Sequence, residues 1–212
     1  MITVFFGKPG TGKGTQAKML EQASGLPAIA TGDVLRKALR EGTPLGLQAK
    51  SAMERGDLVP DDVILGIMKE ALTSPEAIRG AILDGVVRTV PQAEGLERTL
   101  NELGRPLSRV LVFDLPNEEI VRRLSGRTVC EQCQTPYTGR EPGSVCPNCG
   151  GKLVRRKDDD PDAIRNRLAV YERDTAPVLD WYRRRDGGKL VTIDASGTPD
   201  AVLAQVRRAL AL

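Results

Sequence analysis

Residues 7–16 read GKPGTGKGTQ, a glycine-rich stretch with the residue types needed to bind phosphate. Its glycines allow the backbone to curl closely around an anion, because no Cβ atom stands in the way; they are Gly10, Gly12 and Gly14. Lys13 adds a cation for the outer phosphates. The usual pattern, G-x-x-x-x-G-K-[ST], has a hydroxyl directly after the lysine, whereas here the hydroxyl comes one residue later, at Thr15. The stretch predicts a variant phosphate-binding loop; a glycine-rich turn with a surface lysine is the alternative.

Four cysteines form two C-x-x-C pairs, Cys130 with Cys133 and Cys146 with Cys149, separated by twelve residues. Two such pairs can present four thiolates to one tetrahedral ion at about 2.3 Å. All four positions are cysteine, so none remains for water or substrate, and the metal is expected to be structural. Free thiols or disulfides are the alternatives, and a reducing compartment disfavours the disulfides.

Short apolar runs alternate with longer amphipathic stretches along the chain. The runs predict buried strands at 2–6, 27–30, 81–84, 109–115 and 189–194. The amphipathic stretches predict helices at 13–24, 32–42, 61–72, 90–103 and 116–126, and one long helix or a pair kinked around Pro177 at 161–185. This alternation favours an α/β fold, a parallel sheet with helices on both faces. The phosphate-binding stretch lies where the first strand meets the first helix.

Composition limits the possible partners. The 212 residues are 40% apolar, enough for one main domain with room for insertions, and residues 127–157 read as an inserted module. Thirty-one basic and 28 acidic residues give a formal charge of +3, too even to indicate a nucleic-acid or membrane partner. No run approaches the ~18 apolar residues of a membrane span. The opening apolar run, MITVFF, reaches Gly7 without a basic leader or a cleavage-like site. A cytoplasmic protein is expected.

Further motifs make the sequence resemble the adenylate kinases, whose phosphate loop ends in the same Gly-Lys-Gly-Thr. They occur in that family's order: TGDVLR (31–36), GDLVPDD (56–62), DGVVRTVPQA (84–93), GR (126–127), RRKDD (155–159) and IRNRL (164–168). The resemblance implies a P-loop three-layer sandwich with a central five-stranded parallel sheet. It also implies three parts: a core of residues 1–29, 60–125 and 160–212, an AMP-binding domain at 30–59, and a zinc-binding lid at 126–159.

The resemblance also implies roles for individual residues. Phosphoryl transfer is mainly a problem of positioning and charge, for which arginine forks are well suited. The implied catalytic residues are Lys13, Arg88, Arg123, Arg156 and Arg167. The implied ATP-binding residues are Gly10, Thr11, Gly12, Lys13, Gly14, Thr15, Arg127, Pro136, Tyr137 and Gly197. The implied AMP-binding residues are Thr31, Gly32, Arg36, Asp57, Leu58, Val59, Gly85, Val86, Val87, Arg88, Gln92, Arg156 and Arg167.

Two of these assignments have structural alternatives. Gln92, whose amide suits an adenine edge, could instead be a core or capping glutamine. Asp33 and Asp84 would hold Mg²⁺ through water and phosphate, but Asp33 could be only a helix N-cap. Cys130, Cys133, Cys146 and Cys149 would hold structural Zn²⁺ in the lid.

One motif departs from the family pattern. Where the family usually reads Asp-Gly-Phe-Pro-Arg-Thr, this sequence reads DGVVRT, with Val86 and Val87 in place of phenylalanine and proline. We expect a trans peptide bond between them, because a cis bond without proline costs ~3–4 kcal/mol. The departure concerns AMP affinity more than the type of reaction.

The predicted function is Mg²⁺-dependent transfer, ATP + AMP = 2 ADP, by a monomer that binds no nucleic acid and no membrane. GTP as donor or a pyrimidine monophosphate as acceptor is the alternative within the same class. A nucleic-acid-binding P-loop ATPase with a zinc ribbon is an alternative from another class. That alternative requires clustered basic and aromatic residues on the ribbon, where Tyr137 is the only aromatic residue.

Overall fold

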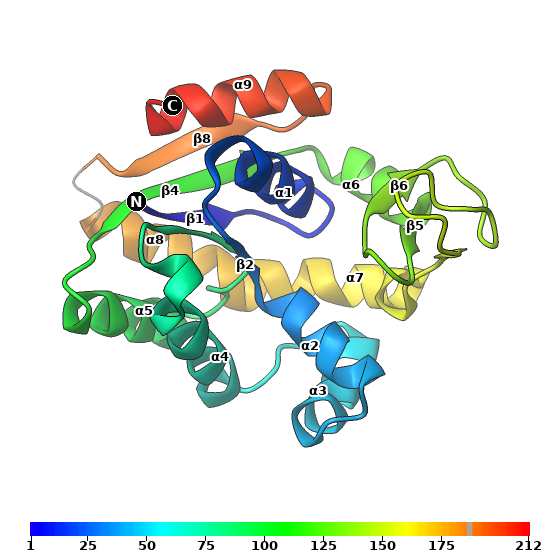
Figure 1. The fold of residues 1–212 in the computed structure, drawn as a ribbon, viewed down its shortest axis with the longest axis horizontal. Coiled ribbons are helices and arrows are strands. Elements are labelled where there is room, and N and C mark those ends of the chain that lie inside the picture. Colours follow the sequence, from blue (N-terminus) through cyan, green and yellow to red (C-terminus); the bar gives the residue numbers. More distant parts are fainter. Residues whose placement is uncertain (186–187) are drawn as a thin grey trace.

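The computed structural model describes residues 1–185 and 188–212. Its centre is a parallel sheet of five strands in the order β2-β3-β1-β4-β8 (Figure 1). The strands are β1 (Ile2–Phe6), β2 (Ala28–Ala30), β3 (Ala81–Asp84), β4 (Leu107–Asp114) and β8 (Leu190–Asp194). The five predicted strands and the α/β fold are therefore confirmed.

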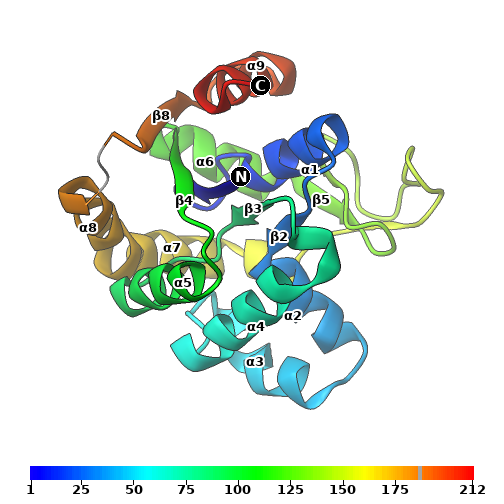
Figure 2. The same cartoon turned by 60° about the vertical axis from the view of Figure 1, so that its left-hand side comes forward.

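Helices cover both faces of this sheet (Figure 2). On one face lie α1 (Lys13–Ser24), α6 (Asn117–Ser125) and α9 (Pro199–Leu210). On the other lie α4 (Asp61–Thr73), α5 (Val90–Glu102) and α8 (Ala176–Arg185), with a short 3₁₀ turn at Pro75–Ala77. Helix α7 (Pro161–Val170) precedes α8 and packs its Ile164 with the cluster of the first face, and a second 3₁₀ turn at Lys157–Asp159 precedes it. No helix within residues 1–185 and 188–212 combines the length and apolar character needed to cross a membrane.

Strand β1 shows why the sheet is buried on both sides. All five of its residues are buried. Successive strand side chains point to opposite faces, so Phe5 packs with α1, α6 and α9, whereas Val4 and Phe6 pack with α4, α5 and α8. The apolar run that predicted this strand therefore contributes to two hydrophobic cores at once.

Two smaller units project from the sheet. Helices α2 (Thr31–Arg40) and α3 (Pro44–Arg55) share a small core with the start of α4, which includes Leu35, Ala49 and Ile64. A three-stranded antiparallel sheet, β6-β5-β7, surrounds the four cysteines; its strands are β5 (Arg127–Cys130), β6 (Pro136–Thr138) and β7 (Leu153–Val154). The elements of these units lie within the segments 30–59 and 126–159 that the resemblance implies as separate domains.

Three details differ from the sequence expectations. Helices α3 and α9 were not predicted. The long helical segment is interrupted by a π-helical turn at Tyr171–Thr175, ahead of Pro177. The wider turn has a physical reason: Pro177 cannot donate a hydrogen bond to Arg173, and its ring crowds that carbonyl.

Gly46 sets the distance between α2 and α3 and provides a test of this packing. A Cβ atom there would lie 2.3 Å from the carbonyl carbon of Ala38. We expect Gly46→Ala to lower the free energy of unfolding by about 1–3 kcal/mol. The matched control is Gly66→Ala, also within a helix, where a Cβ would meet nothing within 4 Å; it should stabilise by ~0.4–1 kcal/mol. Urea denaturation measures both, and equal effects would contradict the close packing.

Candidate active site

The glycine-rich stretch connects β1 to the N-terminus of α1, as predicted. Gly10 and Gly12 have φ angles of 85° and 90°, which glycine adopts without strain. The half-buried Lys13 ammonium donates to the carbonyl oxygens of Gly7 and Lys8, both at 2.8 Å. The loop and the first backbone N–H groups of α1 thus form a positively polarised cradle of the kind that binds phosphate.

The glycine at position 14, where serine or threonine is usual, has a structural explanation. A Cβ atom on Gly14 would lie 3.1 Å from the Oδ2 atom of Asp84, at the end of the neighbouring strand β3. Enclosure by the protein raises the pKa of the Asp84 carboxyl, although the Lys13 ammonium acts in the opposite direction. The loop is therefore a variant in which a carboxylate approaches the start of α1.

A cavity of about 530 Å³ opens at the carboxyl ends of the central strands. Twenty of the predicted site residues line it: Gly10, Thr11, Gly12, Lys13, Gly14, Thr15, Gly32, Asp33, Arg36, Leu58, Asp84, Gly85, Val87, Arg88, Arg123, Arg127, Pro136, Arg156, Arg167 and Gly197. Residues from both ends of the chain and from both projecting units thus meet in one space.

A smaller cavity of about 70 Å³ adjoins the first beneath α2. It is lined by predicted AMP-binding residues that the larger cavity does not reach, namely Thr31, Asp57, Val59 and Gln92. The two cavities share several lining residues, among them Gly32, Arg88 and Arg167. Together they form a long cleft with two ends, and cationic side chains lie where the ends meet.

The cations of this cleft perturb one another. The pKa of Lys13 is lowered to about 8, mainly by loss of hydration; Asp84 acts in the opposite direction, and Arg88, Arg167 and Arg127 add to the lowering. Loss of hydration also lowers the pKa of Arg88 to about 10 and that of Arg156 to about 9. The Nε–H groups of Arg36 and Arg156 are buried and have no hydrogen-bond partner among the described residues. A cluster of dehydrated cations with unused donors is suited to binding a polyanion.

Two aspartates that the sequence analysis did not single out organise these arginines. Asp159 is buried and accepts two hydrogen bonds from Arg127, at 2.7 and 2.5 Å, and one from Arg167 at 3.1 Å. Asp158 lies 3.2 Å from Arg167. Dehydration would raise the pKa of Asp158, but Arg167 and its neighbours outweigh this effect and lower it. The RRKDD motif contained both carboxylates, which was the available signal.

The smaller cavity has a hydrogen-bonded floor. The Gln92 amide donates to the Oδ1 atom of Asp61 at 2.7 Å and accepts from the backbone N–H of Arg88 at 2.7 Å. The Thr31 hydroxyl donates to the carbonyl of Gly85 at 3.2 Å. Because an amide group can form about four hydrogen bonds, Gln92 keeps one donor and one acceptor position for a ligand.

Two predicted residues of the larger cavity, Asp33 and Arg123, have partners that the sequence did not indicate. Asp33 does not cap α2, since the N-cap is Ala30; the Asp33 carboxylate pairs with Arg36 at 2.5 Å instead. Arg123 donates to Glu119 and to the carbonyl of Ala195, and it lines the larger cavity together with Lys13 and Gly197.

Val86 and Tyr137 are the two predicted nucleotide-binding residues that line neither cavity in the described part of the chain. The Val86–Val87 peptide bond is trans, as expected. The Val86 side chain is fully buried in the core beside α5, whereas Val87 borders the cavity. Of the two residues that depart from the family motif, Val86 thus belongs to the core and Val87 to the cavity wall.

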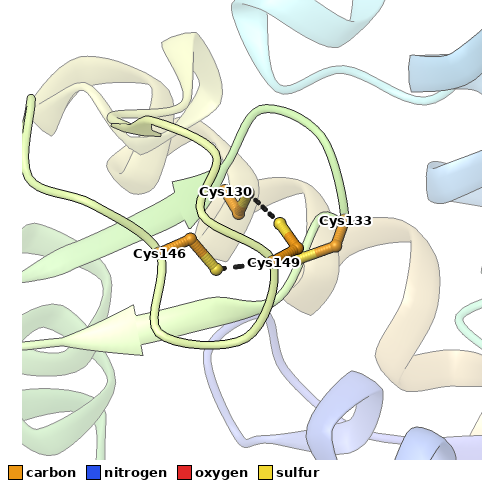
Figure 3. Close-up of side chains that lie close together, drawn as sticks. All are labelled: Cys130, Cys133, Cys146 and Cys149. Carbon is orange, nitrogen blue, oxygen red and sulfur yellow. Dashed lines mark hydrogen bonds between the residues drawn. The ribbon is translucent and has the colours of Figure 1, made fainter.

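The four cysteine sulfurs converge at one point (Figure 3). All lie within 4.8 Å of one another; the Sγ atoms of Cys130 and Cys149 are 3.4 Å apart and those of Cys133 and Cys146 are 3.7 Å apart. Tetrahedral zinc with Zn–S bonds of about 2.3 Å requires sulfur separations of about 3.8 Å. The cluster fits a four-thiolate zinc site with no open coordination position.

The fold and the cleft define a P-loop phosphotransferase that accepts two phosphorylated ligands. The family model described as adenylate kinase matches residues 5–187. The chain is 59% identical to the adenylate kinase of Gemmatimonas aurantiaca over 212 residues, 99% of each chain. It is 44% identical to that of Methanosarcina barkeri over 99% of this chain and 98% of the relative, and 42% identical to that of Carboxydothermus hydrogenoformans over 99% of each. The chain belongs to the adenylate kinase family and is a nucleoside monophosphate kinase.

The lowered pKa of Lys13 predicts a pH dependence of ATP binding. Between about pH 8 and its ordinary value of 10.5, Lys13 in the free protein is neutral where other lysines stay charged. ATP affinity should therefore fall above about pH 8, and binding at pH 9 should take up a proton as the phosphates restore the charge. Calorimetry in buffers of different ionisation enthalpy measures this uptake.

Lys13→Met is the control for this measurement. It should fold normally, lose turnover, bind ATP weakly and take up no proton. A wild-type affinity that stays constant from pH 7 to 9, without proton uptake, would contradict the assignment.

Proposed function

We propose that this chain catalyses the reversible Mg²⁺-dependent reaction ATP + AMP = 2 ADP and so maintains the balance of adenine nucleotides. One observation carries the proposal: dehydrated cations with unused donors lie where the two ends of the cleft meet. Two polyanions brought together there would repel each other in water, and the cations offset that repulsion before any substrate binds.

The larger cavity is the proposed ATP site. The phosphate chain would lie on the cradle formed by residues 10–15, with Lys13 at the outer phosphates. Arg123 lines the same cavity and is proposed, as the resemblance implies, to contact the transferred phosphate. Pro136, on β6, borders the same cavity from the four-cysteine unit, which supports its identification as a lid.

The smaller cavity is the proposed AMP site. Gln92 and Thr31 would face the base, and residues 57–59 would border the base and ribose. Arg36 and Arg88 would hold the AMP phosphate, Arg36 with its unused Nε–H. The unit formed by α2 and α3 is therefore the proposed AMP-binding domain.

The transfer step is assigned to cations at the junction. Lys13, Arg88, Arg156 and Arg167 are proposed to surround the migrating phosphoryl group, together with Arg127, which Asp159 holds in a fixed orientation. Planar forks can contact both the attacking and the leaving oxygens, so the protein contributes alignment and charge without a covalent intermediate.

Two metal ions are proposed, with different roles. Magnesium would neutralise phosphate charge, held through water by Asp33 and Asp84, and Asp84 lies beside the start of α1. Zinc in the four-cysteine site would be structural, because four thiolates fill its coordination sphere. A monomer without nucleic-acid or membrane partners is also proposed. Its proposed location is a reducing cytoplasm, where the four cysteines stay reduced and able to bind a metal.

A kinetic panel tests the reaction. ATP with AMP should give higher kcat/KM than GTP with AMP or ATP with pyrimidine monophosphates. Arg88→Ala should lower kcat about 100-fold or more, since a preorganised charge at the transition state is lost. Arg98→Ala, an exposed arginine of α5, is the control and should leave kcat unchanged. A rise in the KM for AMP alone would show that Arg88 only binds the acceptor; faster turnover with another pair would overturn the substrate assignment.

A second test separates zinc from catalysis. Replacing Cys130 and Cys133 with serine should release about one metal ion per chain and lower the melting temperature, because the lid core is too small to be stable alone. Activity should remain measurable well below that temperature, at a reduced rate because the lid closes less well. Metal content and turnover are measured on one preparation. A folded, metal-free protein without turnover would show that the metal organises the catalytic arginines.

A further inference from the structure

Tyr137 is the one residue of strand β6 whose side chain turns away from the nucleotide cleft. Its neighbours on either side, Pro136 and Thr138, line the larger cavity, whereas Tyr137 does not. Successive side chains of a strand point to opposite faces, so this alternation is what a regular β6 requires. The side chain of Tyr137 therefore faces away from the nucleotide cavity and is available for another role.

The Tyr137 side chain is packed against the four-cysteine cluster. Its hydroxyl lies 3.2 Å from the Sγ atom of Cys146, and its ring contacts the small core formed by Cys130, Cys146 and Leu153. The guanidinium of Arg140 lies 5.6 Å from the ring centroid on the exposed side. Packing and this cation–π contact hold the ring, and the hydroxyl is aimed at one sulfur atom.

A hydroxyl at this position can donate a hydrogen bond to a four-thiolate metal site. Four thiolates and one zinc ion leave two net negative charges, which hydrogen-bond donors around the sulfurs can disperse. A metal-bound thiolate has no proton, so the tyrosine must be the donor. Cys133 has comparable polar neighbours, the Thr135 hydroxyl at 3.2 Å and the Asn148 amide at 3.6 Å.

We propose that the Tyr137 hydroxyl donates a hydrogen bond to the metal-bound Cys146 thiolate, stabilises the metal site and thereby positions the ATP-facing side of β6. The proposal rests on the structural metal site proposed above. Tyr137 is a positioning residue in this assignment: it links the metal to the donor end of the cleft without touching the nucleotide.

The coupling follows the path of the strand. β6 pairs with β5, where Tyr137 lies opposite Thr128, and the next pair joins Thr138 to Arg127. A shift of Tyr137 relative to Cys146 therefore moves Pro136 and Thr138 at the cavity wall and strains the strand that carries Arg127. Pro136 and Thr138 line the larger cavity and not the smaller one, so the main effect should fall on ATP.

The test compares Tyr137→Phe with Tyr182→Phe. The first substitution keeps the ring, its packing and the Arg140 contact and removes only the hydroxyl. The second is a matched control, because Tyr182 is buried in the main core among residues of α8 and α5. Zinc affinity is measured by competition with a chromophoric chelator, and cobalt-substituted protein reports the thiolate-to-metal charge-transfer bands.

Tyr137→Phe should weaken zinc binding about 10–100-fold, the usual effect of losing a hydrogen bond to a metal ligand. It should also shift the thiolate-to-cobalt charge-transfer bands. The KM for ATP should rise several-fold, with the KM for AMP and kcat nearly unchanged. Tyr182→Phe should match wild type in zinc affinity and cobalt spectrum.

The outcomes separate this inference from the metal site on which it rests. Wild-type protein that binds no zinc or cobalt would overturn both. Wild-type protein with one metal per chain, together with a Tyr137→Phe variant of unchanged zinc affinity and cobalt spectrum, would overturn only the role of Tyr137. A change in the KM for ATP with unaltered metal binding would also overturn it, because Tyr137 would then contact the nucleotide itself.

Discussion

The repulsion among cations in one dehydrated cleft is the constraint on which the rest of this structure depends. Lys13, Arg88 and Arg156 all have lowered pKa values because water is largely replaced by protein around them. Such a cluster persists only where carboxylates and fixed backbone dipoles offset part of the repulsion. The carboxylates are those of Asp84, Asp158 and Asp159. The repulsion that they leave uncompensated is reduced when phosphate binds.

The fold meets this constraint by placing the charges on separate elements. The phosphate loop belongs to the rigid sheet and α1, Arg36 to the small unit of α2 and α3, and Arg127 to the lid strand β5. The small unit also contacts helix α7, through Asp57 and Asn166 at 2.8 Å, and the lid boundary, through the exposed pair of Glu54 and Lys157 at 2.8 Å. Exposed pairs of this kind contribute little stability, typically up to ~1 kcal/mol, which leaves the two units able to separate.

The lid has few apolar residues from which to form a stable core. Its core consists of Cys130, Cys146 and Leu153, with Cys133 and Tyr137 at the edge. So small a core cannot repay the entropy of ordering the segment, whereas a tetrahedral metal site can supply the missing free energy. The proposed metal site and the cleft lie on opposite sides of strand β6, since Tyr137 faces the cysteines and Pro136 and Thr138 line the larger cavity.

Most residues of the cleft were named through the resemblance to the adenylate kinases, whereas the sequence by itself determined the strands, the phosphate loop and the cysteine cluster. These features depend on local patterns: apolar runs of strand length, glycines that permit left-handed backbone, and cysteine spacing that presents thiolates in pairs. Helix α3 was not predicted, and its core positions Gly46 and Ala49 are small residues that give a weak amphipathic signal.

Only the tertiary structure decided how the residues of the cleft are oriented and paired. It brought Asp158 and Asp159 to the arginines, placed Arg123 beside Ala195 and turned Tyr137 toward Cys146. It also showed why position 14 is glycine, since the Asp84 carboxylate approaches from a strand seventy residues away in the sequence. Such facts depend on which elements pack together, and spacing along the chain does not encode the direction in which a side chain finally points.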